Sequence, residues 1–136
     1  MERSVTVAVF DGNSGTLQGL IHRLQQVPRI TVVGQAQEPS EALAVVRERQ
    51  PDVVVMDLRR IAPNAVEFLE QLRAAAPQAE IVVFTAYLTE CERADLTRAG
   101  ARAIVLKEID SDALVRAIRS VAGREGRKSV KGVGCK

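Results

Sequence analysis

Short apolar runs alternate along this chain with longer segments of helical periodicity, and this alternation restricts the fold more than any other feature of the sequence. Five runs rich in Val and Ile have the length of strands, at residues 5–10, 30–34, 53–56, 81–84 and 103–106. Such alternation is typical of α/β domains built on a parallel sheet. Because the runs are nearly continuously apolar, we expect helices on both faces of that sheet.

The segments between the runs predict five helices. One ends before Pro28, one spans 39–49, one stops near Pro77, one opens with a capping-box pattern at Thr89 and one runs from about Ser111 to Gly123. The side chains expected to face inward are Leu17, Leu20, Ile21, Leu24, Leu43, Val46, Val66, Leu69, Leu72, Leu114, Val115 and Ile118. The sequence therefore predicts a doubly wound, flavodoxin-like (βα)5 fold whose five parallel strands have the order 2-1-3-4-5.

Charge divides the chain into two parts. The 136 residues carry 19 Lys and Arg against 17 Asp and Glu, and residues 123–136 contain five of these bases, one of the acids and four glycines. The remaining 14 bases and 16 acids give the body a net charge of −2. We expect a folded domain at 1–122, followed at 123–136 by a basic, glycine-rich tail or the start of a linker. A nearly neutral body argues against direct nucleic-acid binding.

Nothing in the sequence predicts a membrane segment or an export signal. The apolar runs are far shorter than the ~20 residues of a transmembrane helix, and the N-terminus lacks the apolar stretch of a signal peptide. We therefore expect a cytoplasmic protein without a membrane partner.

Polar residues stand at the ends of four predicted strands. Asp11, Asp57, Thr85 and Lys107 each directly follow an apolar run. In an open parallel sheet the carboxyl ends of the strands meet at one edge, where ligands bind, and the predicted order makes the strands before Asp11 and Asp57 neighbours. Asp and Thr are also common as capping residues of turns. Four such positions together favour a site.

This set of side chains suits phosphoryl transfer. One carboxylate can attack a phosphoryl group, and the other can hold Mg²⁺, which neutralises the phosphoryl oxygens. An ammonium stabilises the same negative charge, and a hydroxyl can hydrogen-bond the bound phosphoryl group.

Four stretches together resemble the receiver domain of two-component response regulators, over residues 5–122. They are VAVFD at 7–11, QPDVVVMDL at 50–58, IVVFTA at 81–86 and AGARAIVLK at 99–107. The pattern RAGAR at 98–102, and Lys107-Glu108 without a following proline, are most similar to the subfamily with a LuxR-type helix-turn-helix output domain.

The resemblance implies a role in phosphorelay signal transduction and the regulation of transcription. It makes Asp57 the phosphoacceptor, Asp11 a metal-site acid, Thr85 the switch hydroxyl and Lys107 the phosphoryl-contacting lysine, with the backbone carbonyl of Arg59 as a further Mg²⁺ ligand. It implies a signalling domain, with at most slow self-dephosphorylation, rather than an enzyme.

The resemblance also implies partners. A histidine kinase would donate the phosphoryl group, and an output domain would follow covalently beyond residue 136. A homodimer would use either the first and fifth helices or the fourth helix, fifth strand and fifth helix.

The chain departs from the family pattern at three places. Gly12 replaces the second metal acid, which predicts weak Mg²⁺ binding; Asn13 offers a neutral oxygen instead. The loop after the acceptor lacks the usual glycines. Ile104 replaces the aromatic that turns inward on activation, so any coupling would need another element, such as Tyr87, whose alternative role is a partly exposed aromatic.

These departures leave a second hypothesis open, that of a degenerate receiver acting as a phosphorylation-independent protein-interaction module. A third, a flavodoxin-like enzyme or nucleotide binder, would need a phosphate loop or aromatic flavin walls. The sequence has no P-loop motif and only four aromatic residues, which disfavours it.

Overall fold

The computed structural model describes residues 4–57, 64–107 and 112–122, and in these ranges strands and helices alternate. The strands are β1 (Val5–Phe10), β2 (Ile30–Ala36), β3 (Val53–Met56), β4 (Glu80–Thr85) and β5 (Ala101–Leu106). The helices are α1 (Ser14–Gln25), α2 (Pro39–Arg49), α3 (Ala65–Ala75), α4 (Glu90–Ala99) and α5 (Asp112–Ala122). Every neighbouring pair of strands is parallel, in the order β2-β1-β3-β4-β5. The predicted flavodoxin-like (βα)5 fold is confirmed.

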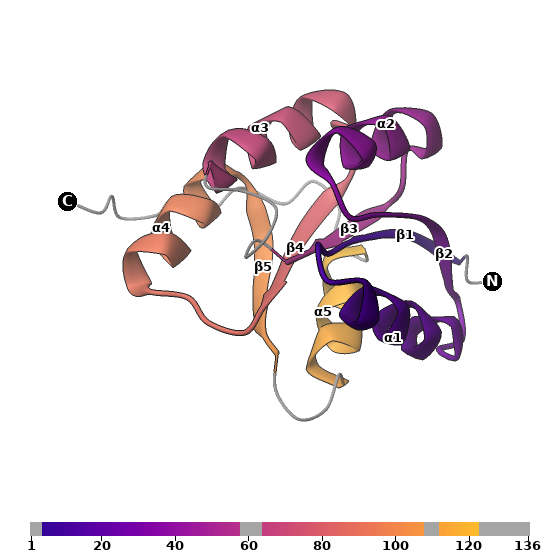
Figure 1. Cartoon of the computed structure of the whole chain (residues 1–136). Coiled ribbons are helices and arrows are strands. Elements are labelled where there is room, and N and C mark those ends of the chain that lie inside the picture. Colours follow the sequence, from indigo (N-terminus) through magenta and orange to yellow (C-terminus); the bar gives the residue numbers. More distant parts are fainter. Residues whose placement is uncertain (1–3, 58–63, 108–111, 123–136) are drawn as a thin grey trace.

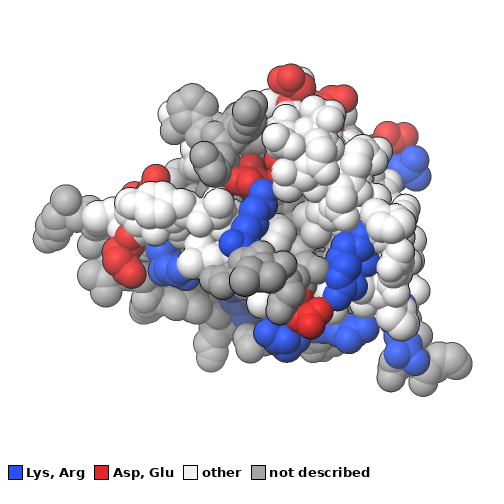
Figure 2. Space-filling view, turned by 60° about the horizontal axis from the view of Figure 1, so that its bottom comes forward, with Lys and Arg blue, Asp and Glu red and all other residues white. Residues whose placement is uncertain are grey.

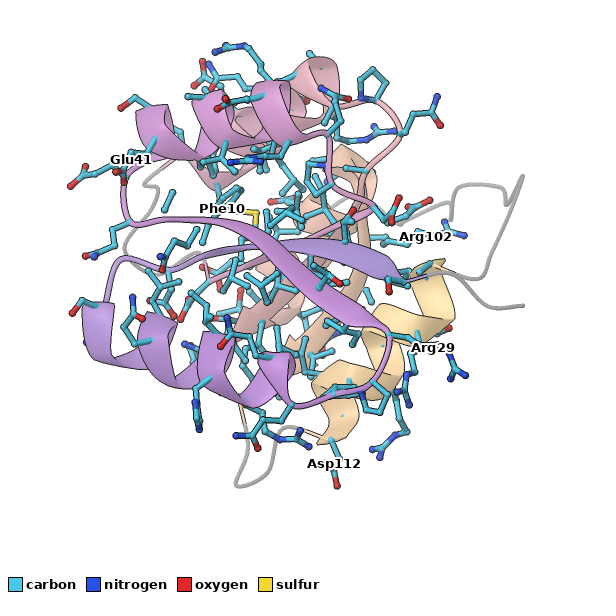
Figure 3. All side chains as sticks on the ribbon, turned by 90° about the vertical axis from the view of Figure 1, so that its right-hand side faces the viewer. Phe10, Arg29, Glu41, Arg102 and Asp112 are labelled. Carbon is cyan, nitrogen blue, oxygen red and sulfur yellow. The ribbon has the colours of Figure 1, made fainter. Side chains whose placement is uncertain are left out.

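Two layers of helices cover the sheet, α1 and α5 on one face and α2, α3 and α4 on the other (Figure 1). Successive strand residues point to opposite faces, so Phe10 and Met56 belong to the core under α2–α4, while Val9 and Val55 belong to the core under α1 and α5. Figure 3 shows Phe10 between the sheet and α2. None of the described helices is long and apolar enough to cross a lipid bilayer.

The structure corrects the predicted elements in two respects. Val66 was expected to face the core of α3, but its side chain is 38% exposed and Phe68 is buried instead. At about 100° per residue, Val66 lies at the edge of the stripe formed by Phe68, Leu69 and Leu72. Three strands are also longer than predicted, so Thr85 is the last residue of β4 rather than the residue after it.

The ends of two helices follow from local sequence. Thr89 and Glu92 form the predicted capping box of α4, with the Thr89 hydroxyl accepting from the Glu92 N–H and the Glu92 carboxylate accepting from the Thr89 N–H. Gly100 ends the helix with a φ of 121°, in a region that favours glycine. The Asn13 side chain caps α1 by accepting from the Thr16 N–H at 2.8 Å.

Candidate phosphoryl-transfer site

The structure brings together Asp11, Asp57, Thr85 and Lys107, as predicted. Among the described residues, Asp11, Asp57 and Thr85 are the buried polar ones, with exposures of 3%, 7% and 1%. Parallel pairing continues past the strand ends: the Asp57 N–H donates to the Phe10 carbonyl at 3.0 Å, and the Lys107 N–H donates to the Thr85 carbonyl at 2.7 Å. These backbone bonds fix the side chains at one edge of the sheet.

Lys107 lies between the two carboxylates. Its Nζ donates to Asp57 Oδ2 at 2.5 Å and to Asp11 Oδ2 at 3.0 Å. The same ammonium lies 5.6 Å from the centroid of the Phe84 ring, close enough for a cation–π contact. One cation therefore contacts both buried anions and offsets part of their charge, which would otherwise be expensive to desolvate.

The environment raises the pKa of Lys107 above its ordinary value of 10.5. Burial by itself lowers the pKa of this ammonium, but the hydrogen bonds and charges of Asp57 and Asp11 outweigh burial. Lys107 therefore remains protonated at neutral pH.

Thr85 holds the other oxygen of Asp57. Its hydroxyl lies 3.4 Å from Asp57 Oδ1, at the outer limit of a hydrogen bond. The Asp57 carboxylate therefore has a hydroxyl at one oxygen and an ammonium at the other. Both groups are placed to hydrogen-bond a phosphoryl group attached to this carboxylate.

The described residues offer few ligands for a metal ion. Among them, no group of three or more His, Cys, Asp or Glu side chains could hold a metal. Asp11 and Asp57 are the two carboxylates of the pocket, while Gly12 adds no side chain. The Asn13 amide oxygen caps α1, and the Asn13 N–H donates to Asp11 Oδ1 at 2.8 Å. Asn13 thus orients Asp11 rather than replacing the missing acid.

Other predicted residues lie outside the pocket or outside the described ranges. Arg59 and the rest of the loop at 58–63 lie outside the described residues. Tyr87 is 71% exposed, which is more than expected for a partly exposed aromatic. Ile104 packs partly buried against the α2–α4 core.

Sequence reasoning missed the position of Phe84 in the pocket and the capping role of Asn13. Phe84, inside β4, lies beside the ammonium of Lys107, which directly follows β5, and only the pairing of these two strands could have indicated this contact. Asn13 carries a clearer signal, because Asn three residues before a helical Thr16 is a typical N-cap.

A family model of the response regulator receiver domain matches residues 7–119. The chain belongs to the response regulator receiver family. It is 34% identical over 121 residues to the DNA-binding transcriptional activator DevR/DosR of Mycobacterium tuberculosis, covering 88% of this chain and 56% of that protein. Receiver domains of such transcriptional regulators are signalling domains, and this one belongs to two-component signalling.

Solved structures agree with this assignment. A LuxR-family two-component response regulator from Aurantimonas sp. SI85-9A1 superposes with a TM-score of 0.81 at 30% identity, covering 89% of this chain and 87% of that one. The receiver domain of the putative response regulator NarL from Mycobacterium tuberculosis has the same fold, with a TM-score of 0.81, 22% identity and coverage of 90% and 100%. The chain spans about half the length of the curated relatives, between 51% and 62%.

Proposed function

We propose that Asp57 of this receiver domain accepts a phosphoryl group from a histidine kinase. The observation that carries the proposal is the arrangement around the Asp57 carboxylate, which is 7% exposed and has the Thr85 hydroxyl at one oxygen and the Lys107 ammonium at the other. An Asp57 oxygen forms a bond to phosphorus while the bond from phosphorus to the kinase imidazole nitrogen breaks, and the nitrogen keeps the electron pair.

Lys107 and Thr85 have separate roles in this proposal. The ammonium offsets negative charge that develops on the phosphoryl oxygens, and its contact with Asp11 holds it in the pocket when no phosphoryl group is present. The Thr85 hydroxyl, at the end of β4, hydrogen-bonds the bound group and connects its presence to the segment leading to α4.

The pocket fits Mg²⁺, but with fewer protein ligands than the family pattern. Mg²⁺ is commonly held by one or two carboxylates together with waters and phosphate oxygens, so Asp11 and Asp57 meet the minimum. Bound there, the ion would supply positive charge to the phosphoryl oxygens. It would compete with the Lys107 ammonium for both carboxylates, and Gly12 contributes no ligand. Weak binding before phosphorylation follows.

The wider organisation is also part of the proposal. Residues 1–122 form the receiver domain and 123–136 begin a linker to a LuxR-type output domain, which is supported by the basic, glycine-rich composition and by relatives about twice as long. Dimer contacts through α1 and α5, or through α4, β5 and α5, are the two arrangements to test. The exposed Leu106 belongs to β5 and so to the second of these surfaces, and the exposed Tyr87 lies in the segment before α4.

The test is the intact mass of the whole chain after incubation with acetyl phosphate or phosphoramidate, with Mg²⁺ and with EDTA. We expect one added phosphoryl group with Mg²⁺, and none in the Asp57→Asn variant, whose amide cannot act as the nucleophile. No addition at high Mg²⁺ would contradict the proposal and favour a phosphorylation-independent interaction module. Labelling of Asp57→Asn would place the acceptor elsewhere.

A further inference from the structure

The helices on the two faces of the sheet carry opposite net charges, although acidic and basic residues are interspersed along the sequence. The layer made of α1, the α1–β2 connection and α5 contains four arginines and one aspartate, which gives it a net charge of +3. In α2, α3 and α4 with the Glu38 cap, eight acids face five arginines, which gives −3. Figure 3 shows Arg29 and Asp112 on the α1–α5 side and Glu41 on the opposite side of the sheet.

Four arginines of this layer, the arginine stripe (Arg23, Arg116, Arg119 and Arg29), follow one another over α1, α5 and the α1–β2 connection, with Asp112 between the first two. Arg23 of α1 pairs with Asp112 at the start of α5 at 2.8 Å. Arg116 and Arg119 follow Asp112 one and two turns along the same helix. Arg119 donates to the Pro28 carbonyl at 3.3 Å, which brings it next to Arg29.

The stripe is accessible. Arg29, Arg116 and Arg119 are exposed, and the Arg23 side chain is 40% exposed. Figure 2, which turns this side forward, shows blue side chains along the lower part of the molecule with a smaller red patch among them. Arg29 has a φ of 67°, a conformation that glycine and asparagine favour, yet the position carries a cation.

The sequence continues the positive charge beyond α5. Residues 123–136 follow that helix directly and contain Arg124, Arg127, Lys128, Lys131 and Lys136 against one acid. A positive helix layer is thus joined covalently to a segment with a net charge of +4.

We propose that the arginine stripe binds the phosphate backbone of duplex nucleic acid, independently of base sequence. A linear band matches a linear array of phosphates, and the planar guanidinium fork suits phosphate oxygens. The net charge of residues 1–122 disfavours nucleic-acid binding only because it sums a positive and a negative helix layer. The opposite, acidic layer turns the positive layer toward the polyanion. This role does not use Asp57, so it holds whether or not the domain is phosphorylated.

The test is fluorescence anisotropy of a labelled 20-base-pair duplex of arbitrary sequence, titrated with the full chain at several KCl concentrations between 25 and 200 mM. Three or four phosphate contacts predict a slope of about −3 in the logarithm of the binding constant against the logarithm of salt concentration. A second duplex of unrelated sequence should bind equally.

Two charge-matched variants locate the binding. Arg116→Glu with Arg119→Glu should weaken binding at least tenfold, whereas Arg47→Glu with Arg49→Glu on α2 should weaken it less than threefold. Both should keep the circular dichroism of the parent chain. Because Arg119 bonds Pro28, Arg116→Glu alone serves as a second variant, with a smaller loss expected.

Several results would overturn the inference. Absence of binding at 25 mM KCl is one, and equal losses in the two variant pairs is another, because net charge alone would then explain the effect. If only Arg127→Gln with Lys128→Gln and Lys131→Gln abolished binding, the tail would be the site. If poly-glutamate of equal charge displaced the duplex as well as a second duplex did, the stripe would be a surface for an acidic protein.

Discussion

Replacing Lys107 with methionine tests the central electrostatic feature of the pocket. Methionine keeps an unbranched chain of similar length, but leaves Asp11 and Asp57, 3% and 7% exposed, without their shared ammonium. Removing one partner of a buried ion pair costs about 3–5 kcal/mol. Because the Lys107 side chain is 21% exposed, solvent screens part of this, and we expect a loss of about 2–3 kcal/mol. For a domain of this size that lowers the Tm by roughly 10 °C.

The assay is urea unfolding at pH 7.5 followed by circular dichroism, with Arg116→Met as the matched control. Arg116 is exposed, so its loss should change the free energy of unfolding by no more than about 0.5 kcal/mol. A double-mutant cycle with Asp11→Asn and Asp57→Asn then isolates the coupling to each carboxylate. If Lys107→Met cost no more than Arg116→Met, or if the cycles gave no coupling, the ammonium would not stabilise the pocket.

The pH dependence has a definite sign. The pKa of Lys107 is raised in the folded state, so its contribution is fully present below the unfolded value of 10.5 and is lost as the pH rises through the higher folded value. The difference in stability between the parent and Lys107→Met should therefore be constant from pH 7 to 9.5 and should shrink only above about pH 10.5. A difference that disappeared between pH 7 and 9 would assign it to another group.

Three further substitutions have distinct expectations. Gly12→Asp should tighten Mg²⁺ binding in a calorimetric titration, since a third carboxylate joins the pocket; an unchanged titration would mean that residue 12 points away. Asn13→Ala should lower the free energy of unfolding by about 1 kcal/mol, measured in urea, because α1 loses its N-cap. Gly100→Ala should lower it by about 1–2 kcal/mol, because the φ of 121° is strained for alanine even after the flexible Arg73 side chain, 2.3 Å from the added Cβ, moves aside.

The sequence predicts most of this fold because both faces of the sheet are covered. Strands such as β3, buried on both sides, consist of apolar residues alone, and the change to helical spacing is then easy to detect. The predictions fail where the apolar spacing fits two neighbouring residues equally well, or where the length of a strand is set by the strand beside it. Val66 fits the spacing of Leu69 and Leu72, and only packing shows that Phe68 takes the inner position. Strand length likewise depends on pairing with a neighbour: β2 runs to Ala36 because it pairs with Phe10.

The four site residues are predictable because sheet topology, rather than side-chain detail, brings strand ends together. Their contacts are not predictable in this way. Whether Lys107 meets one carboxylate or both depends on side-chain conformations and on burial, which no spacing encodes. The separation of charge between the two helix layers cannot be predicted from the sequence either, because residues of one layer, such as Arg23 and Asp112, are 89 positions apart in the chain.

In the proposed function, where Asp57 is phosphorylated and Mg²⁺ binds the pocket, the missing acid at position 12 changes how metal binding and phosphorylation depend on one another. With formal charges, Asp11, Asp57 and Lys107 give the metal-free pocket −1, and Mg²⁺ turns it to +1. A phosphoryl group on Asp57 replaces one negative charge by nearly two, so the phosphorylated pocket carries about −2 without metal and about zero with it. Mg²⁺ is therefore favoured more strongly after phosphorylation than before. An aspartate at position 12 would make the unphosphorylated pocket −2 and let the metal bind first, so Gly12 moves metal binding toward the phosphorylated state and leaves Lys107 as the counter-ion of the resting one.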